Sequence, residues 1–120
     1  MPAPRRLRLS AAAEADIVNL LRWTEEHFGA VPRDRYQRVL SAALADLLAD
    51  PERPGSQFRD ELGDGARLYH LRHSRRRAEV ARPRHVLLYR IEADGNLAVA
   101  RVLHDAMDPA RHAGGDPFAA

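Results

Sequence analysis

Two amphipathic segments follow each other with only a short link between them, and this arrangement constrains the fold more than any other feature of the sequence. Over residues 11–28 the apolar side chains recur at helical spacing, and Gly29 is a typical C-terminal stop. Pro32 suits the first turn of a second helix, whose apolar stripe continues to Leu48. Because the link is so short, we expect the two helices to pack as an antiparallel hairpin.

The segments that follow the hairpin have the pattern of β-strands. The stretch 51–65 is rich in Pro, Gly, Asp and Glu, and we interpret it as a connecting loop. Residues 93–96 contain an Asp-Gly pair, which is typical of a tight hairpin turn because glycine accepts a positive φ. The expected strands cover residues 66–72, 84–92 and 97–104.

One more short strand is expected near the N-terminus, where residues 6–9 alternate arginine with leucine. Ser10 then suits the N-cap of the first helix. The predicted fold is therefore α+β, with a short N-terminal strand, an antiparallel two-helix hairpin and a three-stranded antiparallel meander that forms one small sheet. We expect residues 1–112 to form a single domain and residues 113–120 to be a flexible tail with little to hold it.

Composition restricts the class of protein. A chain of 120 residues with 45% hydrophobic content suits one compact domain, and the lack of cysteine excludes thiol catalysis and thiolate metal sites. Neither a membrane-spanning run nor the apolar stretch of a secretory signal occurs, so we expect a cytoplasmic protein. All 19 basic residues are arginine, which binds carboxylates and phosphates but does not act as a general base near neutral pH.

Arginine is concentrated in the stretch His73–Pro83 and the residues around it, which we expect to form an extended basic loop between the first two strands of the meander. Such a cluster attracts polyanions or an acidic partner protein. A solvated loop in a protein from a GC-rich, arginine-rich genome explains the same composition, and the sequence does not decide between the two. The residues proposed for polyanion or partner binding are Arg75, Arg76, Arg77, Arg82 and Arg84.

The element order and four motifs together resemble the ParE/RelE superfamily of bacterial toxins. FGA at 28–30, ELGDGAR at 61–67 and LLYRIE at 87–92 are individually weak signals, whereas RVLHDAMDPARH at 101–112 is specific to the ParE branch. In ParE-like chains a final strand ends in arginine, valine, leucine and histidine and runs into a methionine, an aspartate and an arginine-histidine pair. The residues that match this motif are Arg101, His104, Met107, Asp108, Arg111 and His112.

The resemblance implies the toxin of a type II toxin–antitoxin system. Its partner would be a co-encoded, ParD-like antitoxin, expected to be a ribbon-helix-helix protein, whose C-terminal segment wraps the toxin. The ParE branch is associated with inhibition of DNA gyrase, whereas the RelE branch cleaves messenger RNA in the ribosomal A site. A third reading is a homologue that binds its antitoxin without being toxic. None of these readings requires a cofactor, and direct binding to nucleic acid is left open.

The residue types favour gyrase inhibition over RNA cleavage. Cleavage by a 2′-hydroxyl requires a base for that hydroxyl, a cation for the developing charge and an acid for the leaving oxygen. RelE-like chains commonly carry lysines on the first meander strand and an arginine and a tyrosine at the C-terminus. This chain has no lysine and no tyrosine after Tyr89. If it is a ribonuclease, the site residues would be Arg67, His70, Arg72 and His104.

The remaining polar and aromatic side chains have structural interpretations. Arg90 and Arg101 lie on predicted strands and need partners. They either pair with Asp108, Glu92 or Glu61 as structural supports, which is the commoner outcome, or line the groove that receives an acidic antitoxin chain. Trp23 is expected to pack at the edge between the two helices. We expect no metal site, because His104 and His112 lack a clear third ligand and His70 and His73 would point to opposite faces of a strand.

Overall fold

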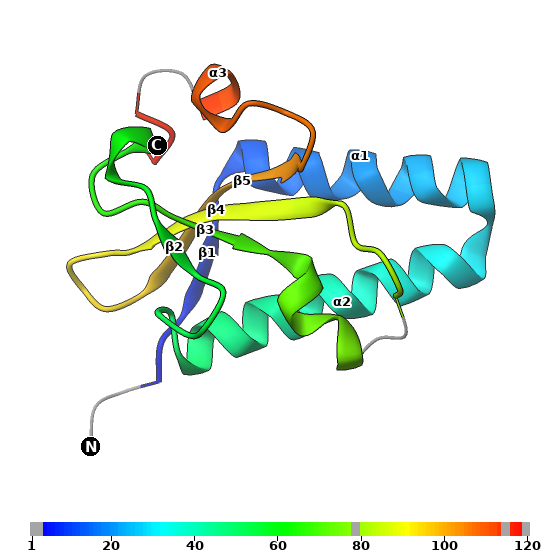
Figure 1. The fold of residues 1–120 in the computed structure, drawn as a ribbon, viewed down its shortest axis with the longest axis horizontal. Helices are drawn as coiled ribbons and strands as arrows, with labels where there is room; N and C mark the ends of the chain where they lie inside the picture. Colours follow the sequence, from blue (N-terminus) through cyan, green and yellow to red (C-terminus); the bar gives the residue numbers. More distant parts are fainter. Residues whose placement is uncertain (1–3, 78–79, 114–115, 119–120) are drawn as a thin grey trace.

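The computed structural model describes residues 4–77, 80–113 and 116–118. Figure 1 shows two long helices lying along one side of a twisted sheet, with a short helix near the C-terminus. The helices are α1 (Ala11–Phe28), α2 (Ala30–Ala49) and α3 (Pro109–Ala113), with two 3₁₀ helices, η1 (Asp60–Leu62) and η2 (Leu71–Arg77). The strands are β1 (Leu7–Leu9), β2 (Gln57–Phe58), β3 (Arg67–His70), β4 (His85–Ile91) and β5 (Leu97–His104).

The helical hairpin follows the local signals in the sequence. The Ser10 side chain accepts a hydrogen bond from the Ala13 N–H at 2.9 Å and so caps α1. Gly29, with φ of 97°, is the only residue between the two helices, and its N–H donates to the Glu25 carbonyl. The predicted hairpin, cap and stop are confirmed, although α2 begins at Ala30, two residues before Pro32.

The sheet is larger than predicted. Its strand order is β1-β5-β4-β3-β2, with β1 parallel to β5 and the other pairs antiparallel. The expected three-stranded sheet was therefore wrong, because the meander of β3, β4 and β5 forms the centre of a mixed five-stranded sheet. Strand β2 is only two residues long and shows no pattern within the Pro- and Gly-rich stretch. The parallel pairing of β1 with β5 depends on where the helical hairpin places the later strands. Residues 6–9 carry no information about that placement.

The inner face of the sheet and the helical hairpin enclose the main core. Tyr69, on β3, is fully buried, and its hydroxyl lies 2.8 Å from the Ser74 hydroxyl of η2. Ser74 in turn donates to the Asp46 carboxylate of α2 at 2.7 Å. The predicted extended basic loop over His73–Pro83 was therefore wrong in its first half, where η2 packs against α2. Residues 78–79 lie outside the described part of the chain.

A β-bulge in β5 changes which residues face the core. Leu88 pairs with Arg101 and Tyr89 pairs with Val99, so that one extra residue lies between these two positions of β5. Val99 and Val102 consequently both reach the main core, although they are three residues apart. The Arg101 guanidinium binds the Asp16 carboxylate of α1, with Nε–Oδ2 and Nη2–Oδ1 distances of 2.8 and 3.0 Å.

Asp16 thus replaces the expected partners of Arg101, which were Asp108, Glu92 and Glu61. Strict alternation along β5 was the wrong assumption, because the bulge shifts the register. Asp16 Oδ2 also accepts a hydrogen bond from the Val102 N–H at 2.9 Å, at the edge of β5 that β1 leaves unpaired. The prediction for the other strand arginine is confirmed, since Arg90 binds Glu92 at 2.9 Å.

A second, smaller core lies on the outer face of the sheet. Phe118 covers this core, and the Arg90 guanidinium lies 4.4 Å from the centroid of its ring. Alanines at 66, 98 and 100 leave room for the ring on the sheet. The expectation that little holds the tail was wrong at this position. No helix in the described part of the chain has the length and apolarity to cross a membrane.

Replacing Phe118 with alanine is expected to lower the free energy of unfolding by about 2 kcal/mol, because the outer core loses its largest apolar side chain. Phe58→Ala is the matched control, since Phe58 is 60% exposed and Phe118 only 9%. Urea unfolding of both variants measures the difference. Equal stability of the two variants would show that the tail contributes nothing to the fold.

Candidate protein-binding groove

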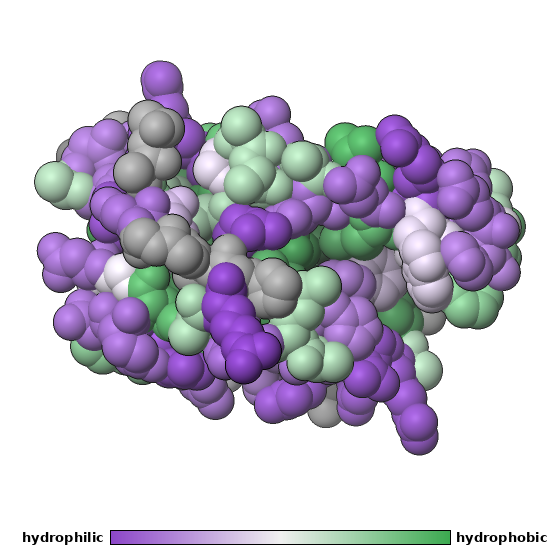
Figure 2. All heavy atoms as spheres, turned by 90° about the horizontal axis from the view of Figure 1, so that it is seen from above, coloured by the Kyte–Doolittle hydropathy of each residue, from purple (hydrophilic) through white to green (hydrophobic). Residues whose placement is uncertain are grey.

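An apolar groove opens between the two long helices, residues 80–85 and the end of β5. Its volume is about 820 Å³. Three large side chains that line it are partly exposed, with exposed fractions of 53% for Trp23, 63% for Phe28 and 44% for Met107. Figure 2, which looks from the side of α1 and α3, shows hydrophobic residues in a hollow bordered by hydrophilic ones. Contiguous exposed apolar surface of this kind marks an interaction site.

Trp23 does not pack between the helices as predicted. Its ring stacks on His27 of the same helix, with the ring centroids 4.2 Å apart, and meets Phe28 edge to face at 5.7 Å. The helical pattern placed Trp23 beside the apolar stripe, and a position at the edge of a stripe faces either the core or solvent. The three rings form an exposed aromatic ledge at the tip of the hairpin.

The charged side chains of the groove leave a positive balance. Asp16 is engaged by Arg101, and Arg84 lies 3.2 Å from the Asp105 carboxylate. Arg35 and Arg82 also line the groove, and neither forms an ion pair with another described residue. The groove therefore combines an apolar floor with two guanidinium groups that form no ion pair with another described residue.

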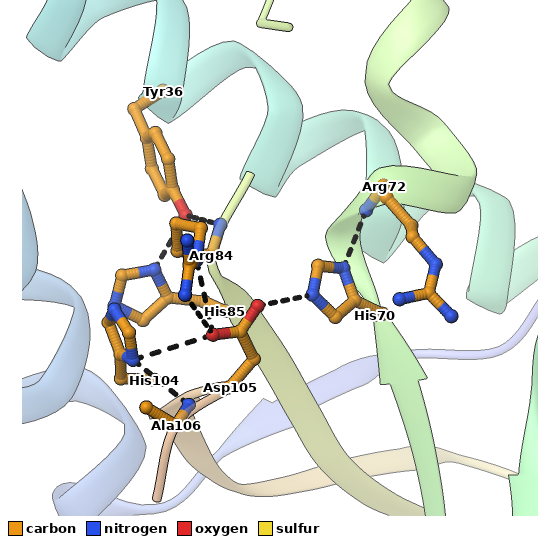
Figure 3. Close-up of polar contacts among 8 residues, drawn as sticks. All are labelled: Tyr36, His70, Arg72, Arg84, His85, His104, Asp105 and Ala106. Carbon is orange, nitrogen blue, oxygen red and sulfur yellow. Dashed lines mark hydrogen bonds and ion pairs between the residues drawn. The ribbon is translucent and has the colours of Figure 1, made fainter. Parts of the chain in front are cut away.

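A half-buried Tyr–His pair lies at the sheet end of the groove. The Arg84 backbone N–H donates to the Tyr36 hydroxyl at 3.0 Å, and this hydroxyl lies 2.5 Å from His85 Nδ1 (Figure 3). Burial raises the pKa of Tyr36 to about 12. Burial, followed by the neighbouring His104, lowers the pKa of His85 to about 4. Both side chains are therefore neutral at pH 7.

Beside this pair, the Asp105 carboxylate links the ends of β3, β4 and β5 through side-chain contacts. His70 Nε2 donates to one carboxylate oxygen at 3.0 Å, and Arg84 Nε donates to the other at 3.2 Å (Figure 3). His104 Nδ1 lies 3.5 Å from the same oxygen as Arg84. The hydrogen bond from His70, followed by the contacts with Arg84, holds the pKa of Asp105 below its ordinary value.

Backbone hydrogen bonds determine which nitrogen of each histidine carries the proton. The Arg72 N–H donates to His70 Nδ1 and the Ala106 N–H donates to His104 Nδ1, each at 3.0 Å. Since an N–H only donates, both rings carry their proton on Nε2 when neutral. His85 has the same tautomer when Tyr36, already an acceptor for Arg84, uses its own hydrogen on Nδ1. In neutral His70 and His104 the ring nitrogen outside these backbone hydrogen bonds, Nε2, is thus a donor, whereas RNA cleavage requires a base.

The four residues named for a ribonuclease occupy different places. His70 and His104 both contact Asp105. Arg67 lies on β3 two residues from Tyr69, on the inner face, and its Nε donates to the Ser56 hydroxyl at 2.7 Å. The guanidinium of Arg72 lies on the far side of His70 from Asp105 (Figure 3). Only His104 of the four lines the groove.

The C-terminal motif forms a strand end, a turn and the short helix α3. Asp108 accepts a hydrogen bond from the Ala110 N–H at 3.0 Å at the start of α3, and its carboxylate lies 4.0 Å from exposed Arg111. Met107 reaches the groove, and the side chain of His112 lies outside the described part of the chain. The motif therefore shapes one wall of the groove and ties β5 to α1 through Arg101.

Among the arginines proposed for polyanion binding, Arg82 and Arg84 line the groove and Arg75 does not. Arg75 Nη1 donates to the Ala81 carbonyl at 3.2 Å, within the same segment. The side chains of Arg76 and Arg77 lie outside the described residues. No cluster of three or more potential metal ligands occurs in the part of the chain that the structure describes.

Sequence reasoning missed Tyr36, Asp16 and Asp105 as members of this region. The helical pattern assigned Tyr36 to the apolar stripe of α2. Tyr36 does face inward, but it lies where this stripe meets the start of β4. Asp105 follows His104 directly at the end of a strand. This pairing of a carboxylate with a histidine in the sequence was the signal that could have identified Asp105. Arg35 carried no signal, because it is one of three arginines on α2.

Comparisons with known proteins agree on one family. The family described as "ParE toxin of type II toxin-antitoxin system, parDE" matches residues 7–109. Toxin ParE1 of Mycobacterium tuberculosis strain H37Rv is 31% identical over 107 residues, which cover 89% of this chain and 96% of the relative. The protein of the same name from strain CDC 1551 / Oshkosh shows the same identity and coverage.

Proposed function

The chain belongs to the ParE toxin family of type II toxin–antitoxin systems, and we propose that it acts in the cytoplasm by inhibiting DNA gyrase. Membership of this family implies a co-encoded antitoxin as the partner. Gyrase inhibition is the activity that the resemblance of the C-terminal motif to the ParE branch implies. Inhibition by binding requires a recognition surface and no general base, which suits His70 and His104, whose Nδ1 atoms already accept backbone hydrogen bonds.

The groove is the observation that carries the proposal. Trp23, Phe28 and Met107 expose apolar surface that a free monomer gains nothing by exposing, and aromatic residues dominate the binding energy of protein interfaces. We assign this groove to the C-terminal segment of a ribbon-helix-helix antitoxin. An amphipathic segment would place its apolar side in the groove and its polar side toward solvent.

Expression of the chain with and without the neighbouring antitoxin gene tests the function. We expect growth arrest, loss of negative plasmid supercoiling and a DNA-damage response, all of which the antitoxin suppresses. Rapid cleavage of messages at codon positions with normal supercoiling would replace gyrase inhibition by RelE-type endonuclease activity. Normal growth with soluble protein and a stable antitoxin complex would identify a non-toxic, antitoxin-binding homologue.

A further inference from the structure

One end of the groove differs chemically from the rest. The hairpin tip contributes aromatic surface through Trp23 and Phe28, whereas the sheet end contributes Arg82, His85 and His104. Arg35 of α2, next to Tyr36, also lines the groove. A partner that fills the whole groove must therefore present an apolar part and a part rich in hydrogen-bond acceptors.

The donors at the sheet end are fixed in orientation. His104 uses Nδ1 to accept from the Ala106 backbone, and His85 uses Nδ1 on the Tyr36 hydroxyl. The hydrogen-bonding atom that remains on each ring is Nε2. On neutral His104 this atom carries the proton, and on His85 it does so when the Tyr36 hydroxyl donates to Nδ1. The two rings meet edge to face, with their centroids 5.4 Å apart and an interplanar angle of 78°. Two neighbouring N–H donors suit an acceptor with two oxygens, such as a carboxylate.

The charge of the region calls for an anion. Among the residues that the structure describes, the carboxylates of Asp16 and Asp105 lie at this end, and both are engaged, by Arg101 and by His70 with Arg84 respectively. Arg35 and Arg82 are left without an acidic partner among the described residues. An acidic side chain entering here gains two guanidinium neighbours and displaces no existing ion pair.

We propose that the sheet end of the groove is a carboxylate-binding subsite, in which Arg35, Arg82, His85 and His104 receive an aspartate or glutamate side chain of the antitoxin. This inference rests on the proposed function, because it specifies the partner of the same groove. The apolar floor favours a peptide over a nucleic acid, because among the described groove residues only Arg35 and Arg82 lack an ion pair that phosphates could replace. The apolar side chains of the same segment lie on Trp23, Phe28 and Met107.

Charge reversal of two arginines on α2 distinguishes a specific contact in the subsite from a general effect of the net charge on binding. Arg35 and Arg38 are both exposed on α2, but only Arg35 lines the groove. We expect Arg35→Glu and Arg82→Glu each to weaken binding of the purified co-encoded antitoxin about tenfold or more at low salt, and Arg38→Glu to change it less than about twofold. Thermal unfolding of the three variants confirms that each is folded.

A second measurement identifies the acidic residue of the antitoxin. Each Asp and Glu in the C-terminal half of the antitoxin is replaced singly by Asn or Gln, and binding is measured to the wild-type chain and to Arg35→Gln. The subsite predicts one replacement that weakens binding to the wild type but adds little on the Arg35→Gln background. Fully additive losses at every acidic position would overturn it.

The outcomes distinguish the subsite from the function on which it rests. An antitoxin that does not bind the wild-type chain contradicts the proposed function itself. If Trp23→Ala weakens binding while Arg35→Glu and Arg82→Glu match Arg38→Glu, the groove holds the antitoxin but the carboxylate subsite is wrong. If Arg35→Glu abolishes binding of a fluorescein-labelled DNA duplex and leaves antitoxin affinity unchanged, the subsite is a phosphate site and the proposal fails.

Discussion

Replacing Asp16 with alanine is expected to lower the free energy of unfolding by about 2 to 3 kcal/mol, the largest effect of any single polar side chain described above. Asp16 accepts two hydrogen bonds from Arg101 and one from the Val102 N–H. Its removal takes this acceptor away from a partly buried guanidinium and from a backbone donor of β5. The helix α1 also loses its polar link to the sheet.

Chemical denaturation measures this effect, with Glu25→Ala as the control, because Glu25 is an exposed carboxylate on the same helix. Arg101→Met should destabilise the fold by a similar amount, since it removes the other half of the pair. Because the two residues share one interaction, the double variant should lose less than the sum of the single losses. Additive losses, or an Asp16→Ala stability equal to that of Glu25→Ala, would contradict a structural role for the pair.

Acidification is expected to destabilise the protein through His85. Its pKa is about 4 in the folded chain, whereas the ordinary value of 6.5 applies to the unfolded chain. Between these values the unfolded state binds the proton and the folded state does not, so stability falls as the pH is lowered from about 6.5 to 4 and changes no further below that range. Over this pH range, protonation of this one ring lowers the free energy of unfolding by about 3 kcal/mol.

The free energy of unfolding, measured at half-unit pH steps, gives this contribution by comparison with His85→Gln, which lacks the titrating ring. We expect the wild-type stability to fall more steeply than that of the variant between pH 6.5 and 4. His27→Gln, at an exposed position of α1, is the matched control for the loss of a histidine side chain. Parallel curves for wild type and His85→Gln would show that His85 titrates normally in the folded chain.

The parts of the fold that the sequence predicts are those with local causes. The hydroxyl of Ser10 and the positive φ of Gly29 act within a few residues, and both mark the helix ends correctly. Strand β5 has the predicted bounds, because continuous apolar sequence follows the Asp-Gly turn directly. Strand β2 and the pairing of β1 with β5 depend on segments far apart in the chain, and no periodicity within either segment records them.

The site was harder to predict for the same reason. The C-terminal motif identified the family, yet Arg101 acts through Asp16, which is 85 residues away in the sequence. The bulge in β5 turns Arg101 toward Asp16. A prediction that assumes regular alternation along the strand does not place the two side chains together. The groove likewise joins α1, α2 and the end of β5, so that Trp23 and His104 are neighbours of one cavity only after folding.

The pairing of β1 with β5 has a consequence for synthesis of the chain. Leu7 pairs with Leu97, so β1 cannot join the sheet until ninety further residues have been translated. At ordinary elongation rates this interval lasts about 5 to 20 s. A polypeptide that ends before β5 lacks both the partner of β1 and one wall of the groove. A fragment that ends before β5 therefore cannot form the complete groove.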